Sequence, residues 1–108
     1  MYKLCFFVPE THVEEVKSVL FELGAGQIGD YDCCAWQVLG TGQFRPLPGS
    51  QPFIGQTEKI TRLSEYKVEM VCTDQLIKQV VKTLLQVHPY QEPAYDVTKI
   101  LSLSELPE

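Results

Sequence analysis

Residues 65–87, EYKVEMVCTDQLIKQVVKTLLQV, decide the fold, because a strand pattern changes into a helix pattern within them. Apolar and polar residues alternate over the first half, which is typical of a strand with one buried face. That face carries Tyr66, Val68, Met70 and Cys72. Asp74 is then expected to cap a helix with a broad apolar side. The helix should end near Val87, because Pro89 disfavours helical geometry for His88.

The N-terminal part repeats this order of strand and helix. Residues 2–8, YKLCFFV, alternate as a strand. Its predicted inner face carries Leu4, Phe6 and Val8, and its other face carries Lys3, Cys5 and Phe7. A helix is predicted over 11–23, with Thr11 and Glu14 as a capping box and Gly24 as its stop.

The other segments complete two β-α-β halves. A strand is predicted near 33–40 (CCAWQVLG), followed by a long Gly/Pro loop over about 40–57. Strand character returns over 59–73, a last strand is expected at about 94–101, and the tail over about 102–108 is expected to be frayed. The prediction is one α+β domain over residues 1–108, a ferredoxin-like βαββαβ sandwich whose two helices cover one face of an antiparallel sheet.

The uncovered sheet face favours self-association. If the alternation is correct, Cys5, Phe7 and Val71 lie there among Lys3, Lys67 and Glu69. A semi-apolar face of this kind is typical of a subunit interface. We therefore expect an oligomer.

Composition excludes several functional classes. Hydrophobic residues make up 44% and charged residues 21% of the 108 residues, as in ordinary globular domains. The net charge of −5 comes from interspersed residues, so neither nucleic acid nor an anionic membrane is an expected partner. The four cysteines show no disulfide-framework spacing, and no secretion signal is visible, so a cytoplasmic location is expected.

Three stretches resemble a known family. They are residues 24–55 (GAGQIGDYDCCAWQVLGTGQFRPLPGSQPFIG), SEYKVEM at 64–70 and HPYQEPAYDV at 88–97. Together they resemble the PII/CutA-like module inserted in the YqfO branch of the Nif-three-like dinuclear-metal proteins, and the stand-alone proteins made of that module. The resemblance implies a ferredoxin-like fold and a homotrimer with the sheets gathered inside.

The resemblance does not bring a metal site with it. In that family the dinuclear site uses His, Asp and Glu ligands from two flanking lobes. This chain has only His12 and His88, and neither matches those ligands. We therefore expect no hydrolase activity, no catalytic residue, no bound metal and no cofactor.

The segment HPYQEPAYDV is the first candidate site. Its polar and aromatic residues are His88, Tyr90, Glu92, Tyr95 and Asp96. As a binding site, it would form one wall for a small molecule or a divalent cation. The structural interpretation, favoured by the absence of any metal-ligand spacing, is that His88 caps a helix end and the tyrosines pack between subunits.

The Gly/Pro loop is the second candidate, with Gly42 and Phe44 as its site residues. It occupies the position of the effector-responsive loop of PII proteins. The sequence G-T-G-Q-F lacks the Lys-Ser/Thr of a phosphate-binding loop. A ligand cleft and packing on a neighbouring subunit therefore remain equal alternatives.

Three hypotheses remain. The first is a non-enzymatic homotrimeric module that binds a small ligand, a metal ion or a protein partner in clefts between subunits. The second is a metal-dependent, hydrolase-like enzyme that uses His88 with Glu92 or Asp96. The third is a purely structural trimerisation module.

Overall fold

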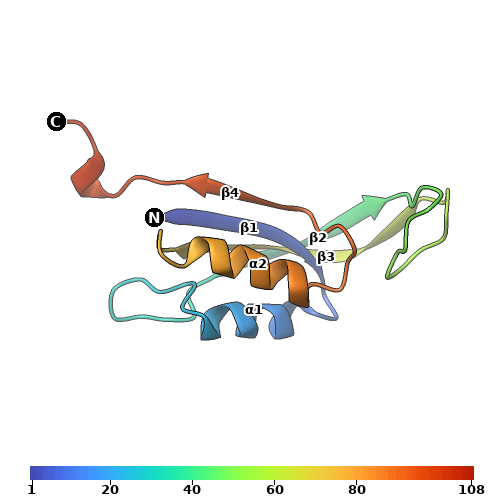
Figure 1. The fold of residues 1–108 in the computed structure, drawn as a ribbon, viewed down its shortest axis with the longest axis horizontal. Coiled ribbons are helices and arrows are strands. Elements are labelled where there is room, and N and C mark those ends of the chain that lie inside the picture. The colour runs from blue at the N-terminus through green and yellow to red at the C-terminus, as the bar shows by residue number, and fades with distance from the viewer.

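The computed structural model describes all 108 residues and has the predicted order of elements. The elements are β1 (Tyr2–Pro9), α1 (Val13–Glu22), β2 (Trp36–Phe44), β3 (Thr61–Cys72), α2 (Ile77–Val87), β4 (Tyr95–Lys99) and a short 3-10 helix, η1 (Leu103–Glu105). The strands form one sheet in the order β2-β3-β1-β4, and all neighbours are antiparallel. Both helices lie on the same side of this sheet (Figure 1). The predicted α+β sandwich is confirmed.

The core forms between the sheet and the helices from the predicted alternating residues. In the register of β1 and β3, Phe6 lies opposite Val68 and Leu4 lies opposite Met70. The strands bury Leu4, Phe6, Val8, Val68, Met70 and Cys72, and the helices cover them with Val13, Val16, Leu20, Val80 and Leu84. The predicted inner face of the sheet is therefore correct, and Tyr66 packs against this core as a half-buried member of it.

Both predicted helix caps are wrong. The first helix begins at Val13, and the Thr11 hydroxyl hydrogen-bonds Nδ1 of His12 at 2.8 Å instead of closing a capping box. The second helix begins at Ile77, and Asp74 forms an ion pair with the amino group of Met1. The observed N-cap residues are His12 and Leu76. Thr11 and Asp74 therefore lie before the cap positions and bond other polar partners instead. The predicted end at Val87 is correct, because His88 is extended.

The Gly/Pro loop begins later than predicted, because β2 continues to Phe44, and it ends at residue 60 instead of about residue 57. Residues 40–44 pair with β3, from Gly40 opposite Glu65 to Phe44 opposite Thr61. Glycines are typical of loops, but the backbones of Gly40 and Gly42 complete the ladder with β3. The irregular loop therefore spans residues 45–60, and the β2–β3 hairpin carries it beyond the helices (Figure 1).

The C-terminal segment extends away from the sheet (Figure 1). Strand β4 ends at Lys99, two residues before the predicted end at residue 101. The tail predicted to be frayed contains η1, in which Ser102 and Glu105 form a capping box. In this tail Leu103 is 87% exposed and Leu106 is 51% exposed. No helix of the chain has the length and apolar character needed to cross a membrane.

The helix-free face of the sheet is semi-apolar, as predicted. On β2 it presents Trp36 and Val38, which are 60% and 44% exposed. At its centre, Glu69 lies 3.4 Å from Lys3 and 3.7 Å from Lys67. These charged groups neutralise one another within the chain, so the face carries little net charge to oppose association with a second sheet.

Candidate functional site

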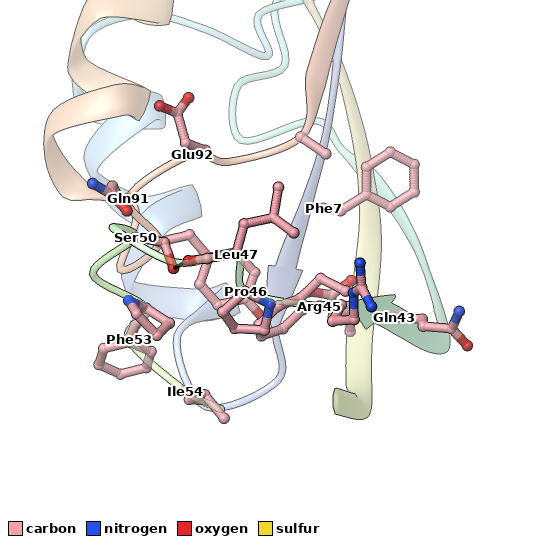
Figure 2. Close-up of a pocket in the computed structure, with 15 residues that line it drawn as sticks. Phe7, Gln43, Arg45, Pro46, Leu47, Ser50, Phe53, Ile54, Gln91 and Glu92 are labelled. Carbon is pink, nitrogen blue, oxygen red and sulfur yellow. Dashed lines mark hydrogen bonds between the residues drawn. The ribbon is translucent and has the colours of Figure 1, made fainter. Parts of the chain in front are cut away.

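A cavity of about 360 Å³ brings the two candidate segments together at one end of the sheet (Figure 2). Apolar and aromatic side chains form much of its wall, and polar groups are spaced among them. The lining residues from the end of β2 and the loop are Gln43, Phe44, Arg45, Pro46, Leu47, Ser50, Pro52, Phe53 and Ile54. The others are Phe7, Glu65, Tyr90, Gln91, Glu92 and Ala94. This mixture is typical of a small-molecule site.

Two contacts tie the loop to the body of the domain. The backbone N–H of Gln51 donates to Oε1 of Gln91 at 2.9 Å, which joins the loop to the segment after α2. The ring of Phe53 meets His12 edge-on, with the ring centroids 5.4 Å apart. These contacts hold the cavity wall although residues 51–60 are exposed to solvent.

Behind the cavity, three side chains position one another in a series. His88 follows α2 and is 5% exposed. Its Nδ1 accepts the backbone N–H of Tyr90 at 3.0 Å, and its Nε2 bonds the carbonyl of Phe7 at 2.7 Å. The hydroxyl of Tyr90 then donates to Oε2 of Glu65 at 2.7 Å. His88 thus fixes Tyr90, and Tyr90 fixes a carboxylate at the cavity wall.

These bonds determine the protonation of His88. Since Nδ1 accepts a hydrogen bond, the proton of the neutral ring lies on Nε2 and is donated to Phe7. Burial lowers the pKa of His88, and the bond to Phe7 and the charge of Glu65 oppose this effect only in part. Both ring nitrogens are engaged, so His88 presents no free nitrogen to the cavity.

We expect the free energy of unfolding to fall as the pH is lowered through the range just below 6.5. The ordinary pKa of an unfolded histidine is about 6.5, and the folded value is lower, so the unfolded chain binds more protons in this interval. The contribution of His88 is complete above about pH 6.5 and is lost as the pH approaches the lowered pKa. Urea unfolding at a series of pH values measures the slope.

Substitution of the buried ring tests the origin of this slope. His88→Gln should flatten the slope just below pH 6.5. A slope that persists unchanged in His88→Gln would contradict this account of the buried ring.

Gly42 contributes space and no ligand group. A Cβ at this position would collide with the carboxylate of Glu65. The missing side chain lets Glu65 lie across β2 with Oε1 against the backbone of Gly42, while Oε2 accepts the hydrogen bond from Tyr90. The carboxylate is thereby held between two strands and the segment after α2.

The structure separates the predicted site residues into three groups. Phe44, Tyr90 and Glu92 line the cavity, and His88 and Gly42 position groups that line it. Tyr95 and Asp96 lie outside it on β4. Asp96 is opposite Cys5, whose thiol pKa is raised by burial and by the charge of Asp96.

Glu65 was not identified from the sequence as a cavity residue, although its parity on β3 places it on the same sheet face as Glu69. The lysines of the sheet face pair with Glu69. The register of the β2–β3 hairpin is the information that would have identified Glu65. Gly42 and Glu65 fall on the same face of this hairpin only when β2 continues to Phe44.

Metal-ligating side chains are not clustered. The chain has no group of three or more His, Cys, Asp or Glu side chains placed to hold a metal ion. The cysteines are all free, and Cys33 is exposed. Its thiol pKa is raised, chiefly by desolvation and then by Asp32, which disfavours the thiolate that a nucleophile needs.

Comparison with solved structures decides what this fold is. CutA from Nostoc sp. PCC 7120, described as a PII-like protein, superimposes with a TM-score of 0.69 over 98% of this chain and 86% of that one, at 16% identity. CutA1 from Pyrococcus horikoshii superimposes with a TM-score of 0.68 over 95% of this chain and 86% of that one, at 15% identity. The chain has the PII/CutA-like fold.

Two relatives with higher sequence identity to this PII/CutA-like module are longer proteins. It is 40% identical over 105 residues to a GTP cyclohydrolase 1 type 2 homolog of Halalkalibacterium halodurans, covering 97% of this chain and 28% of that protein. A Bacillus cereus protein related to NIF3 superimposes with a TM-score of 0.75 at 38% identity, over 89% of this chain and 24% of that one. No family model matches the chain. The module therefore spans about a quarter of the length of these relatives, and the predicted resemblance is confirmed.

Proposed function

We propose that the chain is a non-catalytic PII/CutA-like module that assembles into a homotrimer and binds a small ligand in the cavity beside the 45–60 loop. The cavity carries this proposal. Two segments remote in the sequence, the loop and residues 90–94, meet there and are tied by a hydrogen bond between Gln51 and Gln91. Loops fixed on a rigid sheet are common places for ligand recognition.

The helix-free sheet face supports assembly. Trp36 and Val38 leave apolar surface exposed, and a second hollow of about 250 Å³ lies beside Trp36, Ile28 and Val71. Removal of this surface from water favours association of sheets, as in the trimer that the family resemblance implies.

A binding role is better supported than catalysis by the side chains at the cavity. His88 is the nearest candidate for a general base, and hydrogen bonds occupy both of its ring nitrogens. General base catalysis by a histidine requires a free ring nitrogen within hydrogen-bonding reach of the reacting group. Glu65 already accepts a hydrogen bond from the hydroxyl of Tyr90, which suits a positioned recognition group.

A ligand screen tests the proposal, with a variant whose cavity is filled as its control. Thermal unfolding is followed with nucleotides, divalent cations, amino acids and amines for the natural chain and for Ala94→Trp, which places a large ring in the cavity. We expect at least one compound to raise the melting temperature of the natural chain and not that of the variant. Equal shifts in both chains, or no shift with any compound, would contradict ligand binding in this cavity.

A further inference from the structure

We propose that the cavity takes a small organic cation, an apolar or aromatic body that carries a protonated or quaternary amine. This inference rests on the proposed ligand-binding function and names the chemical class of its ligand. Three features carry it: a fixed carboxylate, the absence of a cation that neutralises it, and a set of aromatic rings beside it.

The carboxylate of Glu65 has no cationic partner. The four ion pairs of the chain use Asp74, Glu14 and, twice, Glu69, so both cavity carboxylates, Glu65 and Glu92, are left without a counter-charge. Glu65 is half-buried, between Gly42 and Tyr90. A carboxylate held in place and partly removed from water attracts a positive group more strongly than an exposed one does.

Three aromatic rings form the adjoining wall. Tyr90 is central, with its ring centroid 5.9 Å from that of Phe44 and 6.4 Å from that of Phe53. The ring planes are tilted by 55° and 45° and are not stacked in parallel. Aromatic faces attract cations, and an ammonium group between such faces and a carboxylate is a recurrent way to bind amines.

The remaining charged residue of the wall, Arg45, does not occupy this place. Its side chain is exposed, and its guanidinium lies beyond ion-pair distance of both Glu65 and Glu92. Figure 2 shows it beside Pro46, at the side of the cavity toward Gln43. The formal charge of the lining is therefore −1, and the chain as a whole carries −5, which also favours a cation.

The test uses three probes that share a phenyl ring and differ in charge: phenethylammonium, phenethyl alcohol and phenylacetate. Each is titrated into the full chain at neutral pH, and binding is followed by NMR of the backbone amides. We expect phenethylammonium to bind about tenfold tighter than the alcohol, with shifts at Phe44, Glu65 and Tyr90. Phenylacetate should bind more weakly than both.

Two variants and a matched control locate the charge. Glu65→Gln should weaken the binding of phenethylammonium about tenfold and leave the binding of the alcohol unchanged. Gly42→Ala keeps every charge but displaces the Glu65 side chain, so it should weaken the same probe. Glu69→Gln removes a carboxylate from the same strand and sheet face outside the cavity and should have no effect.

The outcomes separate this inference from the proposed function. Equal binding of the ammonium and the alcohol in the cavity, or tighter binding of phenylacetate, would overturn the proposed selectivity for a cation. The proposed ligand site would still stand. Absence of binding for all three probes overturns the inference, and absence of binding across the broader screen overturns the proposed function as well. Loss of binding in Glu69→Gln as large as in Glu65→Gln would show that net charge alone attracts the probe.

Discussion

Phe6→Ala is expected to lower the free energy of unfolding by about 3–5 kcal/mol. The ring is fully buried, opposite Val68 in β3 and Tyr95 in β4 and beneath the helices. Its removal takes apolar surface out of the core and leaves a void that neighbouring strands cannot fill. A domain of this size is stabilised by about 5–15 kcal/mol, so the variant loses much of its stability.

Urea unfolding followed by circular dichroism measures this loss. Phe53→Ala is the matched control, because it removes the same atoms from a ring that is 50% exposed. It should cost less than about 1 kcal/mol. Equal midpoints for the two variants would show that the β1 ring does not lie in the core.

Val38→Glu is expected to prevent the proposed assembly and to leave folded single chains. Val38 lies on the helix-free face of β2, opposite Lys67 of β3. In a separate chain the new carboxylate meets that lysine at the surface, so the fold is retained. In an interface between sheets it would be buried at a cost of several kcal/mol.

Leu39→Glu is the control for this prediction. Leu39 is the next residue of the same strand, is 52% exposed and points to the opposite side of the sheet. Light scattering after size exclusion should give the assembled mass for Leu39→Glu and the single-chain mass for Val38→Glu. An assembled mass for both variants would place the interface elsewhere.

The strands and helices could be predicted from sequence because their signals are local. The alternation over 65–73 and the helical spacing after it identify one buried face each, and the core contains the residues that this pattern selects. Pro89 disfavours helical geometry for His88, and α2 ends at Val87 as this requires.

The caps and the end of β2 depend on contacts that local patterns do not contain. Asp74 is next to a suitable helix start in the sequence, but the chain terminus lies beside it in space and takes its carboxylate. Likewise, Gly42 and Gly40 resemble loop residues until the partner strand is known, because their pairing with β3 depends on a register set some twenty residues later.

The two segments of the candidate site could be predicted from the sequence, but a residue whose role depends on remote contacts could not. The loop and the segment after α2 were both identified from composition, and the structure joins them in one cavity. Glu65 was missed because its role comes from two remote residues, Tyr90 and Gly42, that meet it only in the folded sheet.

The mass of the purified chain in solution, by light scattering or sedimentation equilibrium, tests the central claim most directly. An assembling module with the PII/CutA-like fold should give three times the 12.3 kDa of one chain at micromolar concentration. The mass of a single chain under these conditions would contradict assembly through the helix-free face.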